Sequence, residues 1–346
     1  MNSQRLLRQF LPVLSLLAAL AGGFAAPAAA AAAPSACELD RPVRFAGLDW
    51  DSNRLLTEIV RQLFEEDFGC VTQSEEGATL AQFDDLADGD FDVMMEVWET
   101  NFRHRWRAAL RRGAVLDLGA SVEGAVQGWF VPRYLVDGDP DRDIAPRAPD
   151  LRHVDDLPRY AKLFRDPENP SRGRFYNCPL GWSCEIINSN KLRAYGLRGG
   201  FTNYRPRNGE KLLDSLLRHY ARGEPFVTYY WGPSWLLGAR ELIRLDEPAY
   251  DEAHWNGLLT ARARDPRGCA YPRDAVRLGV NARFASEAPR LVALLRAFSL
   301  SRADLDALLA QMRGLGIGHR LAARRFLGEH PELREQWLAA AAATTR

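Results

Sequence analysis

Three short segments carry tryptophans in settings that suit ligand recognition. Trp98 lies within 95–99, Trp182 within 177–185 and Trp231 within 229–235. Trp182 stands between Cys178 and Cys184, and a disulfide between them would hold the indole on a stiff, exposed hairpin. We therefore predict that the three indole rings meet around one small cation.

A quaternary ammonium group suits such rings, because it donates no hydrogen bond and spreads its charge over methyl groups. An indole face is apolar and negative in potential, and each ring over a cation is worth roughly 0.5–2 kcal/mol. Three rings would contribute about 2–6 kcal/mol, which is less than the roughly 8 kcal/mol of micromolar binding. A second contact must therefore hold the other end of the ligand.

The turn at 181–184 can supply that contact. Its backbone N–H groups, together with the positive end of a helix predicted to start at Glu185, favour a carboxylate. A zwitterion with a methylated nitrogen and a carboxylate fits both features.

Residues 1–36 are predicted to be a cleaved signal peptide. Arg5 and Arg8 precede an apolar run at 10–20 and an Ala-rich stretch, with cleavage expected between Ala26 and Ala36. No later stretch is long and apolar enough to span a bilayer. We expect an exported, periplasmic protein.

Export makes the five cysteines interpretable. We expect a Cys178–Cys184 disulfide and, because Cys37 and Cys70 lie at the start of two strands that would be neighbours, a Cys37–Cys70 disulfide. Cys269 is left as a buried thiol. A metal site is the alternative, but the sequence has no Cys-x-x-Cys and its six histidines are scattered, so we expect no metal and no cofactor.

Charge and length limit the classes of function. The 346 residues hold 45 basic and 45 acidic side chains, without a basic stripe. This balance does not favour binding to nucleic acid or to a membrane surface. The length suits one large or two medium domains.

Strands and helices alternate along the chain, which predicts parallel sheets with right-handed crossovers. The expected strands are 43–48, 70–73, 91–95, 115–118, 125–131, 226–230, 242–245 and 275–280. The expected helices are 52–68, 79–86, 102–112, 154–164, 185–195, 210–220, 289–298, 303–314, 319–327 and 333–342. Residues 137–150 are expected to form a surface loop.

We predict an α/β fold of two lobes joined by two crossings. Lobe I comprises 37–127 and 273–346, and lobe II comprises 128–272. Ligands of open parallel sheets bind beyond the carboxyl ends of the strands, and both Trp50 and Trp98 lie just past a predicted strand.

At these residues the sequence resembles the glycine betaine/proline betaine/choline substrate-binding proteins of ABC importers. The resemblance is carried by 178–185, 229–235 and the Asp-Val-x-x-Glu-x-Trp run at 92–98, and extends over about residues 40–300. It implies a type II-like periplasmic binding protein whose lobes close on the ligand. It also implies a monomeric, non-enzymatic receptor for a small quaternary amine that delivers it to an ABC permease and ATPase in the inner membrane.

The resemblance also implies roles for individual residues. It assigns Trp98, Trp182 and Trp231 to an aromatic box, and the backbone N–H groups of Ser183 and Cys184 to the carboxylate. The chain departs from the family pattern at Ser183, where glycine is common, and at 99–102. The secondary candidates for ligand binding are Trp50, Glu96, Glu99 and Asn101. Either glutamate could select choline over a betaine by pairing with a cation that lacks a carboxylate.

Tryptophans outside the three segments have simpler interpretations. We expect Trp106, Trp235, Trp255 and Trp337 to be structural, whereas Trp129 lies at a lobe crossing and could be either structural or functional.

Two other functions remain open. One is an exported hydrolase with Cys184 or Cys269 as nucleophile and His254 as base, which a Cys178–Cys184 disulfide would exclude for Cys184. The other is a sensor that presents the same ligand to a receptor.

Overall fold

The computed structural model describes residues 36–261 and 263–344. The predicted signal peptide therefore lies outside the described residues, apart from Ala36. Across these two ranges, no helix is both long enough and apolar enough to cross a membrane.

The first part of the sheet follows the predicted alternation of strand and helix. It comprises β1 (Val43–Leu48), α1 (Asp51–Phe68), β2 (Thr72–Gly77), α2 (Thr79–Asp88) and β3 (Val93–Val97). β1 pairs in parallel with both β2 and β3. The predicted strand 70–73 begins two residues later than expected.

Helix α1 forms where the sequence repeats apolar residues at helical spacing. Six of these side chains are fully buried: Leu55, Leu56, Ile59, Val60, Leu63 and Phe64. Burial of one such side chain is worth roughly 1.5–3 kcal/mol. Gly69 ends the helix in the left-handed region, with φ 67°, where a side chain would be strained.

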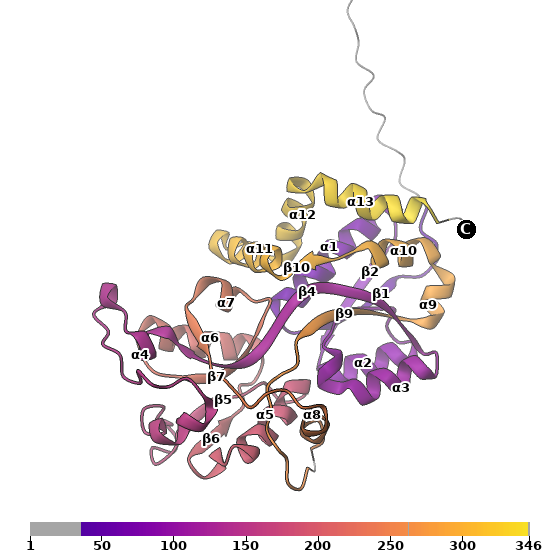
Figure 1. The fold of residues 1–346 in the computed structure, drawn as a ribbon. Helices are drawn as coiled ribbons and strands as arrows, with labels where there is room; N and C mark the ends of the chain where they lie inside the picture. The colour runs from indigo at the N-terminus through magenta and orange to yellow at the C-terminus, as the bar shows by residue number, and fades with distance from the viewer. Residues whose placement is uncertain (1–35, 262, 345–346) are drawn as a thin grey trace, which may run out of the picture. The chain divides into compact units, whose positions relative to one another are not determined.

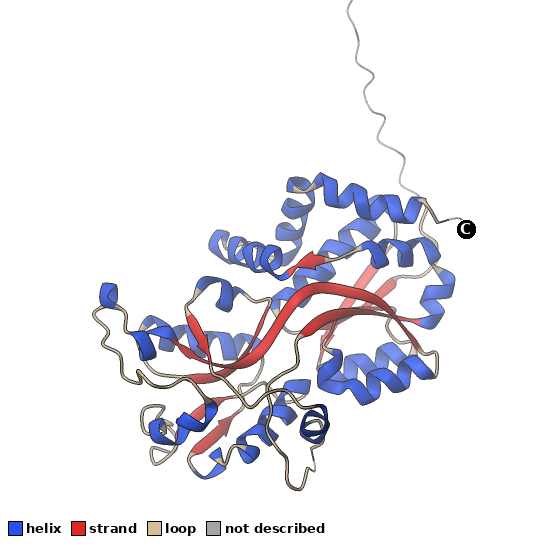
Figure 2. Cartoon of the chain, viewed as in Figure 1, coloured by secondary structure: helices blue, strands red, loops and turns tan. Residues whose placement is uncertain are grey.

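One long strand, β4 (Val115–Pro132), connects the two parts of the sheet (Figures 1 and 2). Its first part pairs antiparallel with β9 (Asp274–Asn281) and its second part with β7 (Val227–Gly232). β3 also pairs antiparallel with β9.

The sequence predicts two short strands where β4 is continuous. Gly119 and Gly124 suggest a turn, but they instead have positive φ values within a strand whose register against β9 shifts repeatedly. The strand absorbs these residues as bulges.

The second part of the sheet is again mainly parallel. β5 (Gly173–Tyr176) pairs in parallel with β6 (Phe201–Tyr204) and with β7. The short strands β8 (Leu242–Arg244) and β10 (Leu300–Ser301) pair with β4. The strand order β2-β1-β3-β9-β4-β7-β5-β6 confirms a mixed α/β fold. Strands β5 and β6, which have four residues each, were not predicted from the sequence.

Helices flank both parts of the sheet (Figure 1). In the first part they are α3 (Arg103–Arg111), α9 (Ala282–Glu287), α10 (Pro289–Ala297), α11 (Arg302–Leu315), α12 (His319–Glu329) and α13 (Pro331–Ala342). In the second part they are α4 (Arg133–Asp137), α5 (Ser183–Ala194), α6 (Gly209–Ala221), α7 (Trp235–Ala239) and α8 (Glu252–Leu258). The 3₁₀ helices are η1 (Glu99–Phe102), η2 (Pro140–Arg142), η3 (Val154–Tyr160) and η4 (Leu197–Gly199).

One predicted helix and one predicted loop differ in detail from the structure. The predicted helix 154–164 is the shorter 3₁₀ helix η3, which contains Pro158; proline has no N–H group for the ladder of an α-helix. The predicted loop 137–150 contains the 3₁₀ turn η2.

Both predicted disulfides are confirmed. Cys37 is bonded to Cys70, which ties the start of the described chain to β2, and Cys178 is bonded to Cys184. Cys269 is a free, fully buried cysteine, as expected.

Candidate ligand-binding site

Strand ends and a helix start position four tryptophans. Trp50 follows β1, Trp98 follows β3 and Trp231 lies near the end of β7. Trp182 is the N-cap residue of α5. The carboxyl ends of neighbouring parallel strands lie at one edge of a sheet, so residues far apart in sequence come together there.

Three of the rings form a corner. The centroids of Trp50 and Trp182 are 4.8 Å apart with an interplanar angle of 65°, and those of Trp182 and Trp231 are 5.1 Å apart at 79°. Trp50 and Trp231 are 6.2 Å apart at 70°. A cation is attracted to a ring whose centroid lies within about 6 Å, so three rings this close together can act on one small cation.

The same corner borders a small cavity of about 20 Å³. Its lining residues are Trp50, Thr79, Trp98, Asn101, Trp182, Ser183, Cys184, Tyr229 and Trp231. The structure thus brings together every predicted site residue except Glu96 and Glu99. This volume is only slightly above the roughly 10–15 Å³ that one water molecule needs, so the rings must move apart a little to admit a methylated ammonium group.

Trp182 is buried, which contradicts the prediction of an exposed hairpin. Only 5% of the surface of Trp182 is exposed to solvent. The indole Nε1 donates to Asp49 Oδ1 at 2.7 Å. A Cβ atom at Gly209 would lie 2.9 Å from the ring, so the chain packs directly against its far edge. Residues distant in sequence cover the ring, and local sequence could not reveal them.

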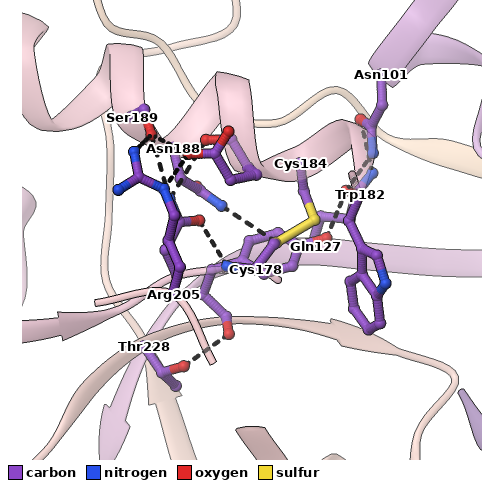
Figure 3. The surroundings of a disulfide bond; sticks show 12 residues. Asn101, Gln127, Cys178, Trp182, Cys184, Asn188, Ser189, Arg205 and Thr228 are labelled. Carbon is purple, nitrogen blue, oxygen red and sulfur yellow. Dashed lines mark hydrogen bonds and ion pairs between the residues drawn. A yellow bond between two sulfur atoms is a disulfide. The ribbon is translucent and has the colours of Figure 1, made fainter. Parts of the chain in front are cut away.

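The Cys178–Cys184 disulfide closes the turn that leads into α5 (Figure 3). Gly181 has φ 90°, and Trp182 makes no side-chain cap for the helix. The first amides of a helix have no partner within the helix. Ser183 and Cys184 supply such amides beside the cavity, where the helix dipole favours an anionic group.

Asn101 is held in position by a polar network at the cavity. Its Nδ2 donates to Gln127 Oε1 at 2.9 Å, and Tyr229 donates its hydroxyl to the same oxygen at 2.8 Å. Figure 3 shows Asn101 and Gln127 close to Trp182 and the disulfide. Sequence analysis did not identify Gln127 or Tyr229, although Tyr229 precedes Trp231 in the same motif.

Glu96 lies behind the box and does not line the cavity. It is fully buried, and its Oε2 accepts from Trp50 Nε1 at 2.8 Å and from Trp98 Nε1 at 3.2 Å. Burial raises the pKa of Glu96 to about 7, against the opposing effect of the Trp50, Ser52 and Trp98 side chains. Glu99 is half-buried in η1.

Trp50 and Trp231 also border a second, larger cavity of about 350 Å³. Asp51 lies in it and pairs with Arg313 and His319. Burial opposes ionisation of Asp51, but these two partners outweigh it and hold its pKa below the usual value.

The remaining tryptophans lie outside the small cavity. Trp106, Trp255 and Trp337 are buried in the core, as predicted. Trp129 is also fully buried and donates to Asn188. Trp235 is half-buried and borders the larger cavity.

The structure does not support a cysteine nucleophile. Cys184 is bonded to Cys178 and has no free thiol. Cys269 is fully buried, and burial raises the pKa of its thiol. A thiol of that kind is a poor nucleophile. Among the described residues, no cluster of His, Cys, Asp or Glu could hold a metal ion.

The chain is similar to proteins of known function. The trimethylamine N-oxide-binding protein of Pelagibacter ubique (strain HTCC1062) is 23% identical over 300 residues, which cover 86% of this chain and 90% of that protein. The glycine betaine-binding periplasmic protein OusX of Dickeya dadantii (strain 3937) is 24% identical over 228 residues, which cover 64% of this chain and 65% of that protein.

A solved structure shares the fold. It is an ABC-transporter choline binding protein in complex with choline, with a TM-score of 0.68 and 17% identity, covering 87% of this chain and 97% of that one. The family model that describes the substrate binding domain of the ABC-type glycine betaine transport system matches residues 41–329. Because this match spans most of the chain, the protein belongs to that family of substrate-binding domains.

Proposed function

We propose that this protein is a periplasmic receptor that binds glycine betaine or a related betaine or choline in its tryptophan box. The observation that carries the proposal is the corner formed by Trp50, Trp182 and Trp231, whose rings border one cavity. Trp98 borders the same cavity and adds a fourth indole. A methylated ammonium group would contact several ring faces at once.

The start of α5 supplies the other half of the recognition. The backbone N–H groups of Ser183 and Cys184 would donate hydrogen bonds to a ligand carboxylate, while the indoles hold the methylated nitrogen. Glycine betaine carries both groups. The named ligands of the relatives, trimethylamine N-oxide, glycine betaine and choline, share a methylated nitrogen.

Closure of two lobes would enclose the ligand. We assign 37–127 and 273–346 to lobe I and 128–272 to lobe II, with hinges where β4 changes partner and where the chain enters β9. Several described hydrogen bonds cross this boundary, among them Trp182 to Asp49, Trp255 to the Thr100 carbonyl and Arg103 to Glu252. They support a closed form in which lobe II holds Trp182 and Trp231, and lobe I holds Trp50 and Trp98.

The receptor would act with an ABC permease and its ATPase in the inner membrane. It would be exported by its N-terminal signal peptide and would make or break no covalent bond. Its contribution is to select the ligand and to present the closed, ligand-bound form.

Isothermal titration with glycine betaine, choline, trimethylamine N-oxide, carnitine and proline betaine tests the proposal. We expect micromolar or tighter binding of at least one of them. Absence of binding for all five would refute it.

The variant Trp182→Ala tests the box itself. We expect at least a tenfold loss of affinity, because the ring contributes roughly 0.5–2 kcal/mol to a cation and also closes one wall. Trp235→Ala is the matched control, since Trp235 lies outside the small cavity and should bind as the wild type does. Equal affinities for all three proteins would show that Trp182 is not part of the site.

A further inference from the structure

A buried carboxylate stands directly behind two walls of the box. One oxygen of Glu96 accepts from both Trp50 and Trp98 at 2.8 and 3.2 Å. These bonds fix the edges of the two indoles, so Glu96 determines how the ring faces are turned toward the cavity. It acts on a ligand through the tryptophans, because it does not itself line the cavity.

Glu96 lacks a cationic partner among the described residues. None of the ion pairs in this part of the chain includes it, and its second oxygen, Oε1, is buried without a hydrogen-bond partner. The nearby hydroxyl of Ser52 opposes the rise in the pKa of Glu96. It does not, however, make a hydrogen bond to Oε1 of Glu96. A buried, unpaired carboxylate is costly unless a positive charge comes near or a proton binds.

We propose that Glu96 is the countercharge of the bound cation. In its ionised form Glu96 positions Trp50 and Trp98, and it releases its proton to solvent when the cation enters the box. The inference rests on the proposed function and extends it to the electrostatics of ligand choice. The bound ammonium group supplies the positive charge that the protein does not.

The direction of the pH dependence follows from the pKa of about 7. Below pH 7 Glu96 carries a proton, which the entering cation must displace, so affinity falls as the pH is lowered. Above pH 7 Glu96 is already ionised and affinity is independent of its titration. The limiting slope is about tenfold in affinity per pH unit for one proton released.

Other titratable groups around Glu96 have partners of their own. At the β1–α1 junction, Asp49 accepts from Trp182, and Asp51 is paired with Arg313 and His319. Burial raises the pKa of Glu96 and hydrogen bonding opposes the rise, and no charged group contributes to the shift.

The same holds for the elements packed against β3. On β9, Arg277 is paired with Asp117, and on α1, Arg54 is paired with Glu76. On α2, Asp84 is paired with Arg105. Glu99, in η1, is half-buried and follows Trp98, but it does not line the small cavity, so it serves as the control.

The countercharge distinguishes ligands by their net charge. Choline carries only the cation, so it gains fully from Glu96. Glycine betaine also carries a carboxylate, which Glu96 repels, so its net gain is smaller. Removal of the charge should therefore weaken choline binding more than glycine betaine binding.

Isothermal titration of the wild type and of Glu96→Gln with choline and glycine betaine, at pH 6, 7 and 8, tests this inference. Each titration is repeated in two buffers of different ionisation enthalpy, which gives the number of protons released. For the wild type with choline we expect close to one proton released at pH 6, and an affinity about fivefold lower at pH 6 than at pH 7, where Glu96 is half ionised. For Glu96→Gln we expect no proton release, no pH dependence and at least tenfold weaker choline binding at pH 8.

Glu99→Gln is the matched control and should keep the wild-type pH profile. Proton release that persists in Glu96→Gln would point to another group, such as His319, and would overturn the inference. If Glu96→Gln does not fold, the wild-type proton count decides alone, and a count of zero overturns it. Failure of the wild type to bind either ligand would instead refute the proposed function.

Discussion

At the scale of single residues, the box depends on side chains whose partners come from distant parts of the sequence. Trp50 was a secondary candidate, yet its ring contacts both Trp182 and Trp231. Trp182 was expected to be exposed, but Asp49 and Gly209 cover it. The residue types alone predicted the chemistry of the site, whereas their burial depends on which segments pack against them.

Glu96 should also affect stability in a pH-dependent way. Its folded pKa, about 7, is above its usual value of 4.5, so the folded state holds the proton more tightly than the unfolded state. The contribution of Glu96 to the free energy of unfolding is therefore fully present below about pH 4.5 and is lost as the pH rises toward 7. The loss is about 3 kcal/mol, at 1.36 kcal/mol per unit of pKa.

Chemical denaturation of the ligand-free protein can measure this effect. Relative to the wild type, Glu96→Gln should gain about 3 kcal/mol in its free energy of unfolding between pH 4.5 and pH 8. Comparing the two proteins at each pH removes the contributions of other titrating groups. A difference that does not change with pH would contradict a raised pKa for Glu96.

At the scale of elements, each recognition group lies where a strand ends or a helix starts. Trp50 and Trp98 follow β1 and β3, Trp231 lies in β7, and the start of α5 carries Trp182 and the amides. Periodicity predicted α1, α2 and α6 well, because one face of each is buried and the pattern repeats. It failed for β5 and β6, since four residues are too few to show a period, and for β4, whose bulges contain glycines typical of turns.

The two disulfides should differ in what they support. In the loop-entropy model, a closed loop of about 34 residues, as between Cys37 and Cys70, is worth about 4 kcal/mol, and the short Cys178–Cys184 loop about 2 kcal/mol. The short loop, however, borders the cavity.

Paired serine variants can separate the two effects. Cys37→Ser with Cys70→Ser should lower stability more and leave ligand affinity unchanged. Cys178→Ser with Cys184→Ser should lower stability less but weaken binding severalfold, because the turn before α5 loses its constraint. Thermal denaturation and calorimetric titration of the two double variants would provide the comparison, and equal affinities would show that the short disulfide is only structural.

At the scale of the whole molecule, affinity should depend on contacts that never touch the ligand. Arg103, from η1–α3, donates to Glu252 at 3.0 Å and to the Tyr250 hydroxyl at 3.2 Å on the other proposed lobe. In the proposed closure of the two lobes, such bonds would form only in the closed state and would favour the form that encloses the ligand.

Arg103→Ala should therefore weaken ligand binding. Glu252 is largely exposed, so we expect a loss on the order of 1 kcal/mol, which is about a fivefold change in affinity. Arg105→Ala is the control, since Arg105 pairs with Asp84 within one proposed lobe. Small-angle scattering should find Arg103→Ala more open than the wild type without ligand; unchanged scattering and affinity would remove Arg103 from the closure.

The sequence by itself predicted the residue chemistry of this protein: indoles suited to a methylated cation, helix amides suited to a carboxylate, and two cysteine pairs. Those conclusions need only residue types and short spacings, which local sequence contains. The tertiary structure alone decided that Trp50 joins the box, that Glu96 supports it from behind and that Trp182 is buried. These features depend on contacts between segments as far apart as Asp49 and Trp182, and such contacts form only when the strands assemble into a sheet.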